Sequence, residues 1–383
     1  MTTPTSVTVE KNGRILSIAS PGKVVRFHAI WLRDNSPDAT TRDPANRQKL
    51  ITINQLPTTV AISAAELTSE NTVSITFEPE QLTATYELSW LLANAYDHPR
   101  NKELGWIRAS QKPWRGDHKP FTAAFTELAD DRATLRDWLS AIRRDGFACV
   151  EDGPTEPEIL FKIVELFGYV RETNYGRLFE VRTEVEPTNL AFTGLGLQGH
   201  TDNPYRDPTP TLQLLYCLEN STDGGLSLVI DGFAAAQRLR DEMPEGFELL
   251  ARYNAAFRYQ GLGGVDLEAR YPMIELEAGG ALRAIRFNNR SIDTATEIPF
   301  EHMEAYYAAY RRFAEIIDDP EMAVSFKLEP GGCFIVDNRR VLHSRTGFSS
   351  AGSRWLQGCY ADRDGLLSTL SVLEQELGPA QSG

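Results

Sequence analysis

Cysteine is scarce in this sequence, which holds four among its 383 residues: Cys149, Cys217, Cys333 and Cys359. They lie far apart in apolar surroundings without a Cys-x-x-Cys pair, which excludes a disulfide framework and predicts buried free thiols in a reducing compartment. Long apolar runs are also absent, because no stretch approaches the roughly 20 residues that span a bilayer. The start, MTTPTSVTVEKNGRILSIAS, lacks a basic segment followed by an apolar core. We therefore expect a cytoplasmic protein with no membrane association.

Basic residues are outnumbered, with 39 Lys and Arg against 53 Asp and Glu and a net charge of −14. A surface with this excess repels a phosphate backbone and mildly attracts small cations. We therefore expect a small-molecule partner and no nucleic acid.

The pattern of the chain changes at two places. Residues 1–95 alternate short β-like runs with polar turns, which predicts a small β-rich domain. Residues 96–119 are rich in charge and proline and are expected to connect it to the rest. Residues 120–383 begin with amphipathic helices and continue as short strands, interrupted by one helix near residues 300–319. This order predicts a mainly β fold with flanking helices (α+β), with a jelly roll over residues 120–383.

Histidine is also scarce, and two of the six histidines stand out. His200 and Asp202 are two residues apart in GLQGHTDNPYRDP, so on an extended chain both side chains point to one face. The preceding glycines match G-x-G-x-x-G by letter, but the prolines that follow exclude the helix that a dinucleotide site needs. His343 ends a strand-like run, GGCFIVDNRRVLH. Two imidazoles and one carboxylate can take one face of an iron ion and leave three positions for chemistry.

A basic residue follows the second histidine at short range. Arg354 lies 354 − 343 = 11 positions after His343, on the strand expected to run back beside it. Its guanidinium suits a dicarboxylate whose other end chelates the metal, and Ser227 could add a hydroxyl donor. The alternative for Arg354 is a surface ion pair.

These features resemble the iron(II)- and 2-oxoglutarate-dependent oxygenases of the taurine dioxygenase type, and within them the γ-butyrobetaine hydroxylase group. The matching segments run in order along the chain: WLRDN (31–35), LQLLYC (212–217), IDGF (230–233), RFNN (286–289), VDNRRVLHSR (336–345) and GCYADRDG (358–365). The resemblance implies a double-stranded β-helix oxygenase domain, an appended N-terminal domain and a homodimer. It implies catalytic metal ligands His200, Asp202 and His343, the cofactors iron(II), 2-oxoglutarate and O2, and a 2-oxoglutarate site of Arg354, Ser227 and Leu215.

One departure from the family concerns a structural metal. After WLRDN the family carries cysteines that bind zinc, whereas this sequence has Ser36, Asp38 and Thr41 there. Hydroxyls and one carboxylate cannot replace three soft ligands in a closed zinc site. We expect no structural zinc.

The resemblance also suggests a substrate with two charged ends. Tyr175, Phe179, Phe192 and Tyr360 match the aromatic box that holds a trimethylammonium group, although plain core aromatics are the alternative. Donors for an anion are expected from Asn189, Asn203, Tyr205, Asn288, Asn289 and Arg290. A full positive charge at Arg290 favours a tetrahedral oxyanion, unless that residue forms only a surface ion pair.

The combination is similar to that of dioxygenases acting on 2-(trimethylammonio)ethylphosphonate, which predicts hydroxylation at the carbon next to phosphorus. The first alternative is hydroxylation of γ-butyrobetaine to carnitine. A non-catalytic small-molecule binding protein on the same barrel is the alternative from another class.

Overall fold

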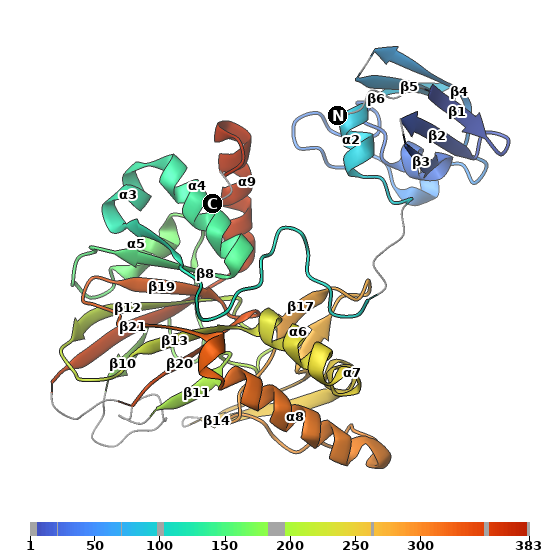
Figure 1. The fold of residues 1–383 in the computed structure, drawn as a ribbon. Coiled ribbons are helices and arrows are strands. Elements are labelled where there is room, and N and C mark those ends of the chain that lie inside the picture. Colours follow the sequence, from blue (N-terminus) through green and yellow to red (C-terminus); the bar gives the residue numbers. More distant parts are fainter. Residues whose placement is uncertain are drawn as a thin grey trace. The chain divides into compact units, whose positions relative to one another are not determined.

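The computed structural model describes residues 6–20, 22–69, 71–97, 103–182, 196–261, 264–347 and 352–380. The chain divides into two compact units, residues 1–100 and 101–383, and the elements of both are labelled in Figure 1. Among the described residues, no helix has the length and apolar character needed to cross a membrane.

The first unit consists of two three-stranded antiparallel sheets with short helices. Its elements are β1 (Ser6–Glu10), β2 (Ile15–Ser20), β3 (Lys23–His28), α1 (Ala29–Asp34), η1 (Ile53–Gln55), β4 (Ala61–Ser69), β5 (Thr72–Glu78), β6 (Leu82–Glu87) and α2 (Leu88–Ala93). Alternate residues of β5, Val73, Ile75 and Phe77, are fully buried, as a strand with one face on a core requires. The β-rich character expected for this part is therefore present.

A polar cluster occupies the segment after α1, where the family resemblance places zinc ligands. Buried Arg33 donates to Glu80 through Nε (2.9 Å) and Nη2 (2.8 Å), and through Nη1 to Thr41 Oγ1 (2.8 Å). Asp38 Oδ1 accepts hydrogen bonds from the backbone N–H groups of Thr40 (2.9 Å) and Thr41 (3.1 Å). These contacts join the segment to the turn between β5 and β6 without a thiolate.

The second unit is mainly β, with helices on both outer faces of two sheets. Its strands are β7 (Phe121–Ala124), β8 (Phe147–Glu151), β9 (Val170–Arg171), β10 (Phe179–Arg182), β11 (Leu197–His200), β12 (Leu212–Asn220), β13 (Ser227–Asp231), β14 (Asn254–Gly261), β15 (Val265–Pro272), β16 (Ile274–Leu276), β17 (Leu282–Ile285), β18 (Ala323–Phe326), β19 (Cys333–Asp337), β20 (Val341–Arg345) and β21 (Arg354–Ala361). Its helices are α3 (Phe125–Asp130), α4 (Arg132–Asp145), α5 (Leu160–Glu165), α6 (Gly232–Glu242), α7 (Pro244–Arg252), η3 (Phe300–His302), α8 (Met303–Ile317), η4 (Pro320–Met322) and α9 (Arg363–Leu377).

Two sheets form the jelly roll. The larger has the strand order β10-β21-β12-β19-β8-β7, with β9 paired to β21, and the smaller has the order β11-β20-β13-β18. Leu215, Phe334 and Leu356 from the larger sheet belong to one buried cluster with Val229 and Val341 from the smaller. Side chains from both sheets therefore fill the space between them, as in a double-sheet fold. This confirms the predicted fold class.

The outer face of each sheet is covered by helices. Leu214 of β12 packs in a cluster with α4, α5 and α9, and Leu342 of β20 packs with α6, α7 and α8. The sequence pattern indicates one helix among the C-terminal strands, whereas the structure also has α6, α7 and α9 there. α6 begins after Asp231, whose carboxylate accepts a hydrogen bond from Phe233 N–H (3.0 Å). The alanines of α6 weaken the helical repeat of apolar residues in the sequence, so the pattern does not predict this helix.

The segment expected to be a connector is fixed to the second unit from residue 103 onward. Gly105 N–H donates to Gly280 O (2.8 Å), and Trp114 donates through its backbone N–H to Asp231 (3.1 Å) and through Nε1 to Asp145 O (2.7 Å). These long-range hydrogen bonds pair backbone groups that would be hydrated in a free linker. The segment is therefore part of the compact second unit.

Candidate active site

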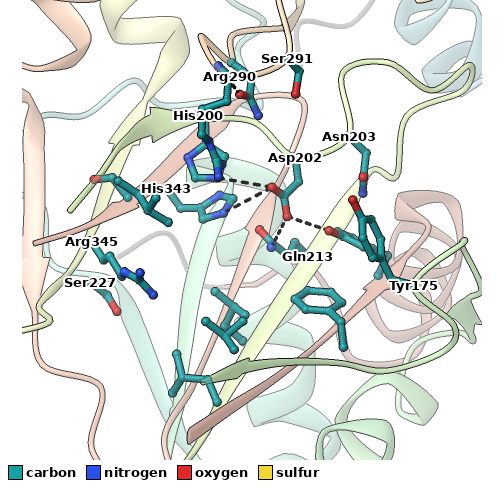
Figure 2. Close-up of a pocket in the computed structure, with 18 of the residues that line it drawn as sticks. Tyr175, His200, Asp202, Asn203, Gln213, Ser227, Arg290, Ser291, His343 and Arg345 are labelled. Atoms are coloured by element: carbon teal, nitrogen blue, oxygen red, sulfur yellow. Dashed lines mark hydrogen bonds and ion pairs between the residues drawn. The ribbon is translucent and has the colours of Figure 1, made fainter. Parts of the chain in front are cut away.

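His200, Asp202 and His343 come together at the β11 edge of the smaller sheet (Figure 2). His200 ends β11 and lies directly opposite His343 of β20 in the strand register. Asp202 Oδ1 is 3.4 Å from His200 Nε2 and 3.9 Å from His343 Nε2. The ligand atoms of the three residues all lie within 4.8 Å of one another. Two imidazole nitrogens and one carboxylate oxygen around a common point form a 2-His-1-carboxylate facial site for non-haem iron.

Neighbouring groups orient these ligands. His200 Nδ1 is 2.8 Å from Gln198 O, so Nδ1 carries the proton and Nε2 keeps its lone pair for a metal. Asp202 Oδ2 accepts hydrogen bonds from Gln213 Nε2 (2.6 Å) and Tyr360 OH (2.7 Å). Oδ1 is therefore the oxygen directed at the histidines, and the donor set fits a divalent iron ion.

The protonation states also favour metal binding. Burial lowers the pKa of His343 to about 3, aided by the charges of His200 and Arg290. Burial raises the pKa of the Asp202 carboxyl, but the neighbouring His200, His343 and Tyr360 outweigh it and hold the pKa below its ordinary value. A neutral imidazole and an ionised carboxylate are the forms that bind a metal.

The triad opens into a cavity of about 360 Å³. Most of the residues predicted from the sequence line it: Tyr175, Phe179, Asn203, Tyr205, Leu215, Ser227, Asn288, Arg290, Arg354 and Tyr360, with the triad itself. Asn189 and Phe192, also predicted, lie outside the described residues. The cavity is large enough for a cosubstrate and a small substrate.

Three predicted residues are committed to contacts within the protein. Asn289 does not line this cavity, because its amide donates to Gln198 Oε1 and its oxygen accepts from Tyr310 OH. Asn288 lines the cavity, but its Nδ2 donates to Thr201 O (3.2 Å) and its Oδ1 accepts from Arg290 N–H (3.0 Å). Asn203 Oδ1 accepts from Tyr205 OH (2.7 Å). The expectation that Asn289 faces the substrate is thus not met in this structure.

Positive charge gathers on one side of the triad. In the view of Figure 2, Ser227 and Arg345 lie on the opposite side of Asp202 from Tyr175 and Asn203. Ser227 and Arg345 are opposite one another in the pairing of β13 with β20. Burial, followed by the charges of Arg354 and Arg290, lowers the pKa of Arg345 to about 10. The Arg345 guanidinium therefore remains charged near neutral pH, and Arg354 and Arg290 lie close enough for their charges to act on it.

Aromatic rings occupy the other side. Phe179 and Tyr360 lie with ring centroids 5.1 Å apart at 33°. Gly358 makes room for this pair, because a Cβ on it would come within 2.3 Å of the Phe179 ring. Glycine at this position of β21 thus opens the cavity wall to an aromatic ring.

Gln213, Arg345 and Tyr259 are among the lining residues that were not predicted from the sequence. Two of them carried a usable signal: Gln213 is the polar residue at an inward position of the apolar run LQLLYCL, and Arg345 follows His343 by two on the same face of β20. Tyr259 carried none, because its place depends on long-range pairing.

A jelly roll with this triad is the arrangement of a non-haem iron oxygenase. The chain belongs to the family described as "Taurine catabolism dioxygenase TauD, TfdA family", whose model matches residues 110–360. Residues 7–92 match the model "Gamma-butyrobetaine hydroxylase-like, N-terminal". Both matches agree with the resemblance seen in the sequence.

Relatives match over nearly the whole chain. The γ-butyrobetaine dioxygenase of Pseudomonas sp. (strain AK-1) is 35% identical over 356 residues, which covers 92% of each chain. The human γ-butyrobetaine dioxygenase is 28% identical over 358 residues, again covering 92% of each chain. The trimethyllysine dioxygenase of Meyerozyma guilliermondii is 29% identical over 368 residues, which covers 92% of this chain and 91% of the relative. The chain is accordingly an Fe(II)- and 2-oxoglutarate-dependent dioxygenase, which confirms the predicted enzyme class and cofactors.

Proposed function

We propose that the protein hydroxylates a small anion that carries a trimethylammonium group, with γ-butyrobetaine as the first candidate substrate and carnitine as the product. The observation that carries this proposal is the division of one cavity into an aromatic side and a cationic side around the metal triad. The relatives named γ-butyrobetaine dioxygenase support the same substrate class.

The aromatic side suits the trimethylammonium end. Tyr175, Phe179 and Tyr360 offer ring faces, and among the described residues that line the cavity the metal ligand Asp202 is the only carboxylate. A quaternary ammonium group has no N–H to donate, so it needs no hydrogen-bond acceptor. The faces of aromatic rings attract its positive charge. Phe192 belongs to the same hypothesis by resemblance alone.

The cationic side suits the cosubstrate. Arg354, with Ser227, Leu215 and the additional Arg345, would hold the far carboxylate of 2-oxoglutarate, while His200, Asp202 and His343 would hold iron(II). Iron supplies the activation of O2 when it is bound. The chain's own contribution is to hold substrate and cosubstrate in a fixed orientation inside one cavity.

Arg290 is the residue proposed for the anionic end of the substrate. It lines the cavity near His343, whose pKa its charge helps to lower. This observation keeps 2-(trimethylammonio)ethylphosphonate as the second candidate, because a dianionic head group gains more from a guanidinium than a carboxylate does. The sequence alone favours the phosphonate; the relatives, named for γ-butyrobetaine and trimethyllysine, support γ-butyrobetaine as the first candidate instead.

The test is succinate and product formation with a panel of trimethylammonium carboxylate, phosphonate and sulfonate, in the presence of Fe(II) and 2-oxoglutarate. We expect γ-butyrobetaine to have the highest kcat/KM. Arg290→Ala should lower kcat/KM for γ-butyrobetaine by about ten- to hundredfold, as expected for the loss of a contact to a charged group. The matched control is Arg283→Ala, an exposed arginine of β17 outside the cavity, which should change nothing.

Different outcomes separate the candidates. A wild-type preference for the phosphonate, with a larger loss for it than for the carboxylate in Arg290→Ala, would establish the second candidate. Turnover of no panel member, while 2-oxoglutarate still binds, would refute the substrate class and leave the dioxygenase class intact.

A further inference from the structure

Two further tyrosines line the cavity beside Tyr175. Tyr205 follows the metal-ligand segment, and Tyr259 comes from β14. The rings of Tyr205 and Tyr259 stack with centroids 5.0 Å apart at 20°, and Tyr175 lies 5.9 Å from Tyr259 at 53°. We call these three residues the tyrosine wall. The sequence suggested Tyr205 for the anionic end, but its ring belongs to this wall.

Two hydroxyl groups of the wall, those of Tyr175 and Tyr205, are hydrogen-bonded within the protein. Tyr175 OH and Tyr205 OH are 3.0 Å apart, and Tyr205 OH donates to Asn203 Oδ1 (2.7 Å). Tyr205 therefore accepts from Tyr175, and the chain ends on the residue next to Asp202. A ligand group that cannot form hydrogen bonds can therefore fill the cavity without leaving either hydroxyl unpaired. The cost of burying an unpaired hydroxyl is avoided.

The backbone that carries Tyr259 is tied to the segment that carries Arg290. β14 and β15 form an antiparallel hairpin. Arg258 N–H donates to Ser291 O (2.8 Å), and Asp293 N–H donates to Ala256 O (2.8 Å). Ser291 itself lines the cavity. Tyr259 and Arg290, the proposed anion contact, therefore lie on backbone segments that are joined by hydrogen bonds, and these bonds hold the two residues at a fixed separation.

We propose that Tyr259 is a specificity-determining residue that recognises the cationic end of the substrate through its ring. The inference rests on the proposed trimethylammonium substrate and goes beyond it by adding a residue outside the aromatic box that the sequence suggests. Tyr205 supports the Tyr259 ring by stacking, and Asn203 positions Tyr205. The competing role for Tyr259 is plain packing, which would not distinguish a charged ligand from a neutral one of equal shape.

The test compares γ-butyrobetaine with 5,5-dimethylhexanoate, in which carbon replaces the cationic nitrogen. Dissociation constants are measured without O2 on the full-length protein loaded with Fe(II) and 2-oxoglutarate. In Tyr259→Leu we expect the preference for the cation to fall by about five- to thirtyfold, the range for a desolvated cation–ring contact. Tyr259→Phe keeps the ring and should retain most of the preference.

Tyr307→Leu is the matched control, because Tyr307 is a half-exposed tyrosine of α8 (52% exposed) that does not line this cavity. It should leave both constants unchanged. An equal loss for both ligands in Tyr259→Leu, or no loss for either, would overturn the proposal, since packing alone explains those results. Wild-type protein that binds the two ligands equally would instead refute the trimethylammonium substrate itself.

Discussion

Gln213 is expected to set the iron affinity of the site without touching the metal. Its side chain is almost fully buried (2% exposed), and its Nε2 donates to Asp202 Oδ2 at 2.6 Å. Leucine has a similar volume and no donor, so Gln213→Leu removes one bond and leaves the carboxylate with Tyr360 alone. We expect the freed carboxylate to turn away from the single-oxygen orientation that points Oδ1 at the histidines.

The size of the effect follows from the type of bond. A buried hydrogen bond to a charged group contributes about 1.5 to 3 kcal/mol, which corresponds to roughly ten- to hundredfold in affinity. Removal of a residue that hydrogen-bonds to a metal ligand typically lowers metal affinity by the same ten- to hundredfold. Tyr360→Phe should act similarly, and the double variant should lose less than the sum, because both donors serve one oxygen.

The assay is an anaerobic titration with Fe(II) in the presence of 2-oxoglutarate, followed by the visible absorption of the chelate. Gln357→Leu is the matched control: Gln357 is equally buried in the same sheet, but its Oε1 accepts from Glu158 N–H (2.7 Å) outside the cavity. It should lower stability and leave iron binding unchanged. An unaltered iron affinity in Gln213→Leu, or a loss equal to that of Gln357→Leu, would refute the reasoning.

Two predictions concern the first unit. Purified protein should hold no stoichiometric zinc, because residues 1–100 contain no cysteine; one tightly bound zinc per chain by elemental analysis contradicts this. Burial raises the pKa of Asp38, but hydrogen bonds from Thr40 and Thr41 outweigh it and lower the pKa to about 2. The stabilisation by ionised Asp38 is therefore fully present above the ordinary pKa of the carboxyl and is lost as the pH falls through about 2. In unfolding titrations, Asp38→Asn should cost about 1 kcal/mol at pH 7, after allowance for solvent screening, and only a small part of that at pH 2; an equal cost at both would contradict it.

The metal triad was predictable because its signal is local. His200 and Asp202 lie two positions apart at the end of β11, and His343 lies in the middle of β20, directly opposite His200. Once these strands pair, the direction of each side chain follows from the period of two. Arg354 and Tyr360 face inward for the same reason, six residues apart on β21.

Other parts of the site depend on information that one sequence does not carry. Asn288 and Asn289 are neighbours with the same chemistry, yet only Asn288 lines the cavity. Where the chain leaves β17, no regular period decides which of the two faces inward. Tyr259 lies on β14, which is joined to residues 291–293 by backbone hydrogen bonds. Such non-local pairing, unlike strand alternation, has no short-range pattern.

The proposed function gains its selectivity from holding both ends of one molecule. If the tyrosine wall fixes the cation and Arg290 fixes the anion, the length of the chain between them decides which carbon faces the metal triad. A substrate with fewer carbons between its two charged groups reaches both contacts only if its anionic group is larger. A tetrahedral phosphonate is larger than a planar carboxylate. The two candidate substrates would therefore occupy the cavity differently. A change in the spacing of Tyr259 and Arg290, which adjoining backbone segments carry, is the change that would move selectivity from one to the other.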